Sequence, residues 1–171
     1  MIRFKSTLIV TALIAAGVAA PAFAASKDTN FTVNINVTGS CKFISASNIN
    51  FDSSDATPGT TDKTGTLKVQ CTKSLPFSLQ LDAGINGASN VNARKMKSTT
   101  GTDTIAYQLY SDSFNTVWGT ATSGVGAVTG TGTGFGGSTL DQTFTVSARA
   151  TLTGTEPVAT YTDTIKATVT Y

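Results

Sequence analysis

The sequence contains no histidine, and its other chemically active residues are sparse. It has one glutamate, Glu156, and nine aspartates that lie among predicted turns and strand ends, where hydrogen bonds to the local backbone explain them. Without histidine the chain cannot form Ser-His-Asp or Cys-His triads, histidine-bearing zinc sites, or the usual general base near neutral pH. No two acids stand out as the facing carboxylates that a glycosidase needs. The sequence therefore predicts a protein that is not an enzyme and needs no metal or cofactor.

Helical periodicity is also missing. No segment keeps apolar residues at helical spacing over three turns, whereas segments with period two recur. Apolar residues share one side of each such segment, at Leu67, Val69 and Cys71; at Phe77, Leu79 and Leu81; at Ile105, Tyr107 and Leu109; at Phe144, Val146, Ala148, Ala150 and Leu152; and at Tyr161, Ile165, Ala167, Val169 and Tyr171. Turn signals separate them at 55–62, 86–90 and 154–157. About seven strands with this punctuation predict an all-β fold, a β-sandwich of the immunoglobulin type.

The long apolar run lies at the start of the chain. Arg3 and Lys5 precede about 15 mostly apolar residues, fewer than the roughly 20 that span a membrane. Ala22, Phe23 and Ala24 then form the small-x-small pattern that signal peptidase reads. We predict that residues 1–24 are a signal peptide cleaved after Ala24 and that the mature chain is exported. An uncleaved anchor is the alternative.

The predicted mature chain has no excess charge. The full sequence carries 12 Lys+Arg and 10 Asp+Glu, and loss of Arg3 and Lys5 balances the two signs. No basic stripe remains to hold nucleic acid or an anionic membrane. The nearest candidate, RKMK at 94–97, is better interpreted as a charged edge or turn. The sequence therefore predicts no nucleic-acid partner.

Two cysteines, Cys41 and Cys71, lie in the part predicted to be exported. An even pair in an oxidising compartment favours a disulfide, and two cysteines without histidine make a poor metal site. Both fall on or beside predicted strands, so we expect a bridge between neighbouring strands near one end. No tryptophan lies between them, which argues against an antibody-type domain.

Residues 119–137 depart from the strand pattern and contain eight of the sixteen glycines. No strand-turn-helix unit surrounds them, so the glycines do not indicate a phosphate site. We predict a flexible surface hairpin. A glycan- or surface-binding loop is an alternative without a supporting residue pattern.

The segment NFTVNINVTGSC at 30–41 alternates regularly, ahead of everything that resembles a domain. Its apolar side comprises Phe31, Val33, Ile35 and Val37. Such a strand is an association hazard, because its backbone and its side chains both need partners. It could pair within its own sandwich, be disordered, or complete the sheet of another molecule by strand addition. Four regularly spaced large apolar residues argue against disorder.

Several of these features together resemble the spore coat U domain family, whose better-known members are pilins of archaic (Csu-type) chaperone–usher pili. The features are the signal peptide, the short N-terminal strand, TGSC at 38–41, the second cysteine, and the ending YTDTIKATVTY at 161–171. The ending is the most specific part. The resemblance covers essentially the whole mature chain, although its middle, including residues 119–137, matches no family motif.

The resemblance implies an incomplete immunoglobulin-like β-sandwich that lacks one strand and leaves a hydrophobic groove, which a donor strand from a neighbouring subunit completes. A periplasmic chaperone first fills the groove, and an outer-membrane usher exchanges its strand for the N-terminal strand of the next subunit. Transferred to this chain, residues 25–37 are the donor strand and residues 38–171 are the sandwich domain. The donor side chains are Phe31, Val33, Ile35 and Val37. The strand that borders the groove spans 161–171, with Tyr161, Ile165, Ala167, Val169 and Tyr171.

The implied function is that of a structural subunit of an adhesive pilus, which supports attachment and biofilm formation. Its partners are identical or homologous pilin subunits, the chaperone and the usher, and its place is the cell surface. One domain with a donor segment favours a shaft subunit over a tip adhesin. Two alternatives remain open: a spore-coat or secreted matrix protein, and a monomeric carbohydrate-binding β-sandwich. The candidate aromatic group for the latter is Trp118, Tyr107 and Tyr110, which core packing explains more simply.

Overall fold

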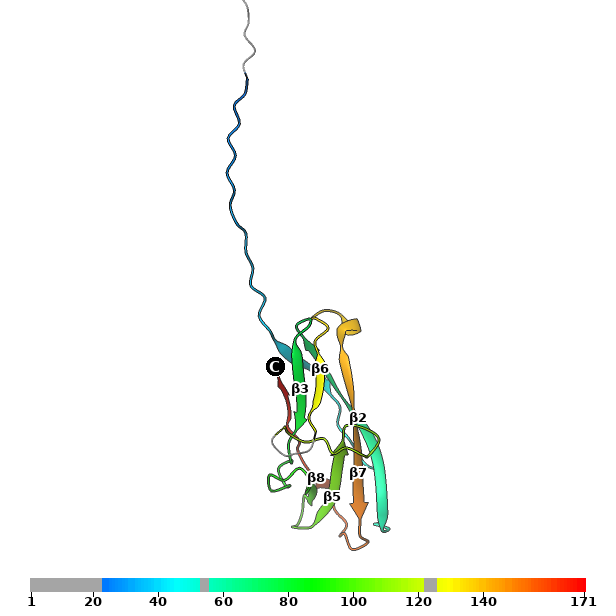
Figure 1. Cartoon of the computed structure of the whole chain (residues 1–171). Coiled ribbons are helices and arrows are strands. Elements are labelled where there is room, and N and C mark those ends of the chain that lie inside the picture. Colours follow the sequence, from blue (N-terminus) through cyan, green and yellow to red (C-terminus); the bar gives the residue numbers. More distant parts are fainter. Residues whose placement is uncertain (1–22, 53–55, 122–125) are drawn as a thin grey trace, which may run out of the picture. The chain divides into compact units, whose positions relative to one another are not determined.

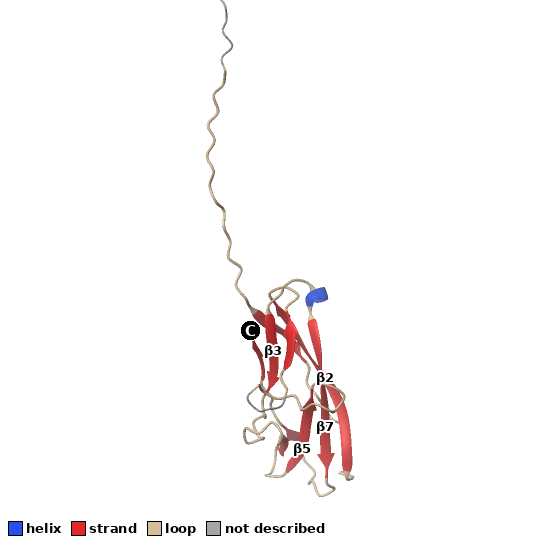
Figure 2. Ribbon diagram, viewed as in Figure 1, coloured by secondary structure: helices blue, strands red, loops and turns tan. Residues whose placement is uncertain are grey.

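The computed structural model describes residues 23–52, 56–121 and 126–171. The chain divides into two units, Met1–Ile35 and Asn36–Tyr171. In the first unit, described residues 23–35 carry no helix or strand and are exposed (Figure 2). The predicted signal peptide, residues 1–24, lies outside the described residues except for its last two. No helix in the described ranges is long and apolar enough to cross a membrane.

The described part of the second unit contains two sheets in which all strand pairs are antiparallel (Figure 1). The strands are β1 (Cys41–Ala46), β2 (Gly59–Cys71), β3 (Pro76–Leu81), β4 (Lys95–Ser98), β5 (Thr104–Tyr110), β6 (Val128–Thr131), β7 (Gln142–Leu152), β8 (Tyr161–Thr162) and β9 (Ala167–Thr170). A short 3-10 turn spans Ser138–Leu140. One sheet has the order β1-β2-β7-β5-β4-β8 and the other β6-β3-β9. The predicted all-β class is confirmed.

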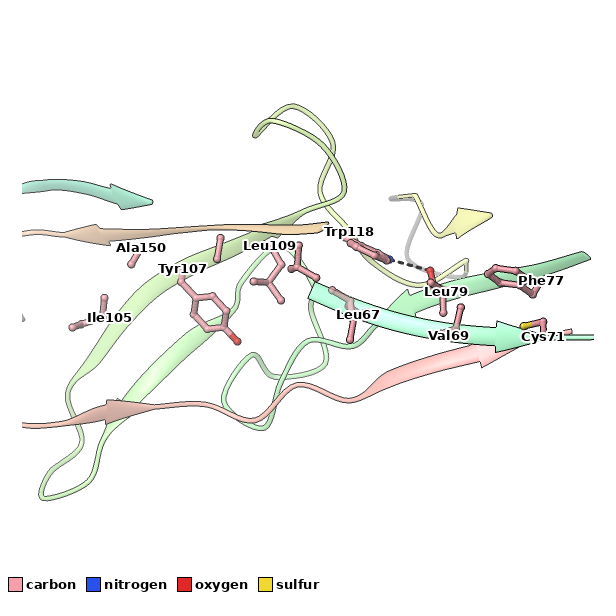
Figure 3. Packing of buried hydrophobic residues seen from close by; sticks show 13 residues of the cluster. Leu67, Val69, Cys71, Phe77, Leu79, Ile105, Tyr107, Leu109, Trp118 and Ala150 are labelled. Atoms are coloured by element: carbon pink, nitrogen blue, oxygen red, sulfur yellow. Dashed lines mark hydrogen bonds between the residues drawn. The ribbon is translucent and has the colours of Figure 1, made fainter. Parts of the chain in front are cut away.

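One hydrophobic core is built from alternate residues of four strands (Figure 3). Strands β2, β5 and β7 supply core residues from the six-stranded sheet, and β3 supplies core residues from the three-stranded sheet. The buried strand residues are Leu67, Val69, Cys71, Phe77, Leu79, Leu81, Ile105, Tyr107, Leu109, Val146, Ala148 and Ala150. Successive side chains of a strand point to opposite faces, so the period-two pattern of the sequence becomes one buried and one outer face.

The long strand β2 begins earlier than the sequence predicts. It pairs with β7 without interruption from Gly59↔Leu152 to Val69↔Gln142. The predicted turn at 55–62 is therefore wrong for its second half, because residues 59–62 are strand. The length of β7 explains this, since its far end offers backbone partners to every residue that continues β2. Residues 53–55 lie outside the described residues.

The glycine-rich segment is partly built into the fold. Strand β6 lies within it and pairs with β3, and Gly130 faces Phe77. A Cβ at Gly130 would overlap the Phe77 ring, so the glycine lets the two strands approach across that ring. Gly132 N donates a 2.7 Å hydrogen bond to Leu75 O. The predicted flexible hairpin is thus wrong for Val128–Thr131, which form a strand paired with β3. Residues 122–125 lie outside the described part of the chain.

Candidate functional site

Strands β1 and β9 each lie at an edge of their sheet. Within the described part of Asn36–Tyr171, β1 pairs only with β2, and β9 pairs only with β3. The outer backbone edge of each strand is therefore not covered by another strand of this unit. An edge of this kind is a template for a further strand.

A hollow of about 490 Å³ lies between the chain that continues β1 and the chain that leads into β9. Its walls are residues 46–51 on one side and 161–165 with Ala167 on the other. The core strands supply the floor, with Leu67, Leu81, Tyr107, Leu109, Val146 and Ala148. The floor is apolar apart from the hydroxyl of Tyr107, so the hollow suits a hydrophobic occupant.

A second hollow, of about 570 Å³, continues the first. Residues 49–51, Met96 and residues 161–162 line both hollows. Beyond them the second hollow reaches Ile105, Ala150, Leu152 and the loop at 156–160. Together the two hollows form one elongated depression, which we call the open groove. Its length follows the chain from Ala167 back to Glu156.

The apolar side chains along the open groove are only partly covered. Tyr161, Ile165 and Ala167 pack against the core but stay half-buried, as does Val169 nearer the end of β9. On the neighbouring strand β3, the corresponding apolar residues are 1–4% exposed. Burial of the apolar side chains is therefore less complete along the groove than on β3. An apolar strand laid into the groove would cover them.

The predicted C-terminal strand at 161–171 is two short strands in different sheets. Tyr161 pairs with Ser98 of β4, whereas Val169 pairs with Leu79 of β3. Residues 163–166 cross between the sheets; we call them the crossover. Tyr171 lies beyond β9 and is 57% exposed, so it does not share the half-buried environment of the other four residues named for this strand. The strand is interrupted because Asp163 makes hydrogen bonds outside either ladder.

The predicted donor side chains belong to segments without strand structure. Phe31, Val33 and Ile35 lie in the first unit, and Val37 lies at the start of the second. They are between 73% and 90% exposed. Each is a large apolar side chain that remains mostly exposed to solvent. Their role as donor residues remains a prediction.

The predicted disulfide joins Cys41 and Cys71. The two residues are direct partners in the β1–β2 ladder, with Cα atoms 4.1 Å apart. Cys71 is fully buried. The bridge therefore fastens the first residue of the edge strand β1 to the last residue of the central strand β2, as expected for neighbouring strands near one end.

A buried arginine was missed by the sequence analysis. Arg94 is 1% exposed, although 94–97 reads as a charged edge or turn. Its guanidinium donates to Asp82 O at 2.6 and 2.9 Å, to Trp118 O at 2.7 Å and to Leu81 O at 3.1 Å. A further bond of 2.6 Å reaches Gln108 Oε1. Burial lowers the pKa of Arg94 below its ordinary value. The nearby phenol of Tyr107 and the carboxylate of Asp82 offset only part of this effect.

A second polar cluster lies at the wall of the open groove. Asp163 accepts hydrogen bonds from Tyr107 Oη at 2.6 Å, from Ile85 N at 3.0 Å and from Asn86 Nδ2 at 3.0 Å. The signal for it in the sequence is the aspartate of the ending YTDTIKATVTY, whose role the pattern does not reveal.

The aromatic group considered for carbohydrate binding is not a surface platform. Trp118 is fully buried and donates from Nε1 to Leu79 O at 2.9 Å. Tyr107 is buried in the same core, as Figure 3 shows. Only Tyr110 is half-buried, with an edge-to-face contact to Phe114. Sugar-binding platforms need exposed ring faces, so these three residues do not form one.

Comparison with known proteins identifies similar chains. One is the pilus subunit in a crystal structure titled as the CsuC–CsuE chaperone–tip adhesion subunit pre-assembly complex from archaic chaperone–usher Csu pili of Acinetobacter baumannii. It is 20% identical, with a TM-score of 0.54, over 79% of this chain and 40% of that one. This chain thus spans less than half of the length of that subunit. The likeness shows a shared, immunoglobulin-like pilin fold.

No curated protein matches the chain significantly. The Spore Coat Protein U domain model matches residues 27–168. This range includes most of the N-terminal segment, both cysteines, both walls of the open groove and the first half of β9. The chain belongs to the Spore Coat Protein U domain family.

Proposed function

We propose that this chain is a non-enzymatic structural subunit of a chaperone–usher pilus. Its open groove receives a donor strand, and its own residues 25–37 fill the groove of the next subunit. Residues 38–171 form the incomplete immunoglobulin-like sandwich. The observation that carries the proposal is the open groove, whose floor is apolar and whose lining includes Ala46 of β1 and Ala167 of β9, strands that each have an uncovered edge.

The donor segment has the chemistry that the open groove requires. Phe31, Val33, Ile35 and Val37 would share one face of a strand, and polar residues occupy the other. Burial of four such side chains contributes about 6 to 12 kcal/mol in gross terms, at about 1.5 to 3 kcal/mol each. Hydrogen bonds to the uncovered edges add about 0.5 to 1.5 kcal/mol net for each bond. Since whole domains are stable by about 5 to 15 kcal/mol, a donated strand decides whether the subunit stays folded.

Donation of a leading segment to a groove elsewhere on the next copy is a head-to-tail contact. A contact of this kind makes a filament when its rotation does not close a ring. Before assembly, residues 1–24 are removed on export to the periplasm, where a periplasmic chaperone holds the chain. An outer-membrane usher then assembles the filament at the cell surface. Attachment and biofilm formation are the roles of the finished fibre. The family membership and the similar structure, a chaperone–subunit pre-assembly complex from chaperone–usher pili, support this route.

Two matched substitutions test the donor face. Ile35→Asp places a charge in the apolar groove and should slow polymerisation of the mature chain by at least about tenfold, because an unpaired buried charge is strongly unfavourable. Asn34→Asp adds the same charge on the opposite face and should leave the rate close to that of the unmodified chain. The measurement is light scattering and electron microscopy after release from the chaperone. Equal rates for all three chains would contradict the donor assignment.

Deletion of residues 25–37 tests the division between donor and domain. The truncated subunit should still bind the chaperone, because its groove is intact, but should form no polymers. Fibres of normal length from the deleted chain would refute the proposal. A stable closed monomer of the mature chain, with residues 25–37 protected inside its own groove, would favour the monomeric β-sandwich instead.

A further inference from the structure

The crossover at 163–166 needs a reason for its path. Tyr161, Ile165, Ala167 and Val169 alternate as they would in a single straight strand. Yet β8 pairs with β4 in one sheet, and β9 pairs with β3 in the other. Four residues between them leave both ladders. Backbone groups that leave a ladder need other partners, so specific contacts must hold this path.

Asp163 supplies the first set of contacts. Its carboxylate accepts three hydrogen bonds, from Tyr107 Oη of β5, from Ile85 N and from Asn86 Nδ2. The last two donors lie in the loop that follows β3. One side chain therefore ties the crossover to the six-stranded sheet and to this loop. Hydrogen bonds to an ionised acceptor are about twice as strong as those between neutral groups.

Asp82 supplies a second set at the other end of the crossover. Its Oδ1 accepts hydrogen bonds of 2.9 Å from Lys166 N and from Gly84 N, and its own N donates to Lys166 O at 3.1 Å. The buried Arg94 donates two hydrogen bonds to the carbonyl of the same residue, Asp82. The crossover is thus held at both ends by polar contacts.

The loop is shaped to receive the Asp163 carboxylate. Gly84 has φ of +73°, a conformation that favours glycine. A Cβ at this position would overlap Asp163 Oδ2. The close approach of Asp163 therefore depends on a residue without a side chain.

The crossover, which the hydrogen bonds of Asp163 and Asp82 hold in place, is also a wall of the open groove. Asp163, Thr164 and Ile165 line it, and Ile49 and Phe51 lie in the facing wall. Ile165 and Ile49 are both half-buried. Without these hydrogen bonds, movement of the two side chains toward each other across the groove would be favourable, since it removes apolar surface from water.

We propose that Asp163 is a positioning residue for strand uptake: its hydrogen bonds to Tyr107, Ile85 and Asn86 hold the crossover away from the facing wall, so that the groove stays open before a donor strand enters. This inference rests on the proposed function, because the occupant of the groove is a donor strand. Its physical basis is preorganisation, since a wall already in place need not be ordered or moved during binding.

The test uses the full mature chain and a fluorescent peptide with the sequence of residues 25–37. Peptide affinity is measured by anisotropy at concentrations too low for polymerisation. Asp163→Ala should weaken binding at least about tenfold, the effect of losing one hydrogen bond to a charged group. Tyr107→Phe, which removes one hydroxyl only, should weaken it less. Asp163→Asn keeps an acceptor oxygen and should restore part of the affinity.

A control separates positioning from general stability. Gln70 is buried and donates to Asp141 Oδ1 at 2.7 Å, and it lines neither hollow of the groove. Gln70→Ala should lower the thermal midpoint without changing peptide affinity. Hydrogen exchange of residues 163–166 should speed up in Asp163→Ala and stay unchanged in Gln70→Ala.

The possible failures are distinguishable. If the unmodified chain binds the peptide and Asp163→Ala and Tyr107→Phe bind it equally well, the positioning role is wrong and the proposed function stands. If affinity falls in Gln70→Ala as much as in Asp163→Ala, the effect is one of stability and the positioning role is again wrong. If the unmodified chain does not bind the peptide, the proposed function fails and this inference with it.

Discussion

Tyr107 Oη donates a 2.6 Å hydrogen bond to Asp163 Oδ2 and thereby joins β5 to the crossover between β8 and β9. Burial of Tyr107 and, second, this hydrogen bond raise the pKa of the phenol above its ordinary value of 10.0. The Tyr107 hydroxyl therefore stays protonated in the folded protein at neutral pH. It acts as a fixed donor to the wall of the groove.

This relationship predicts a loss of stability in alkali. Because the pKa of Tyr107 is raised in the folded state, its contribution is complete below about pH 10 and is lost as the pH rises above that value. In urea unfolding from about pH 9 to about pH 11, the unmodified chain should lose stability more steeply than Tyr107→Phe, which has no phenol to ionise at this site. Parallel curves for the two chains would show that Tyr107 does not carry the effect.

The hydrogen bonds of Glu156 predict a loss of folding stability at low pH. Its carboxylate accepts hydrogen bonds from Thr153 N and Thr153 Oγ1, both at 2.7 Å, and from Gly154 N at 3.0 Å. The bonds from Thr153 chiefly lower the pKa of Glu156 from 4.5 to about 2. The stability that depends on this carboxylate is present above pH 4.5 and is lost as the pH falls through about 2.

Glu156→Gln should therefore be less stable than the unmodified chain at neutral pH, and the difference should shrink in acid. The effect is small, because the carboxylate lies at the surface. Thermal midpoints at neutral pH and at about pH 2.5 measure it. A difference between the chains that is the same at both pH values would contradict the role of the ionised carboxylate.

The disulfide predicts a defined loss on removal. Cys41 and Cys71 are 30 residues apart, and a loop of that length stabilises a fold by roughly 3 to 4 kcal/mol when it is closed. The double variant Cys41→Ala with Cys71→Ala should unfold at correspondingly lower denaturant concentration. A reducing agent should shift the unmodified chain toward the variant and leave the variant itself unchanged. A reducing agent without effect on either chain would contradict the prediction.

The buried Arg94 predicts a large and selective loss. Arg94→Met removes the donors to the carbonyls of Leu81, Asp82 and Trp118, and each buried acceptor left without a partner is unfavourable by about 1 to 3 kcal/mol. We expect destabilisation of at least about 3 kcal/mol in chemical unfolding. The control is Arg149→Met, which breaks the surface ion pair with Asp62 and should change stability little. Equal effects from both substitutions would show that burial of Arg94 is not the cause.

The sequence predicts the strands better than it predicts their partners. Leu67, Phe77, Ile105 and Val146 all lie on the faces that their alternation indicates, because a strand with one buried face requires that pattern. Alternation does not say which sheet a strand joins. The split of the C-terminal segment at Asp163 therefore has no signature in its apolar residues.

The polar clusters and β6 were missed for a related reason. Arg94 is buried because carbonyls from Leu81, Asp82 and Trp118 converge on it, and these residues lie 12 to 24 positions away from it on either side in the sequence. Strand β6 exists because Gly130 fits under the Phe77 ring, which a glycine-rich composition alone does not indicate. The two walls of the open groove come from 46–52 and 156–167, so the groove itself is a property of the folded chain. The donor face at 31–37 stays a prediction from pattern.

The sulfur bridge at the first residue of β1 has a mechanical consequence. If residues 25–37 are anchored in a neighbour, tension along the fibre enters this domain at Cys41, the end from which β1 would otherwise peel away from β2 one ladder bond after another. The bridge to Cys71 passes that load directly to β2, which β7 supports along eleven paired positions from Gly59 to Val69. The edge strand can therefore not unzip from its loaded end while the covalent link is intact, and the strength of each link in a fibre would be set by the grip on the donated strand.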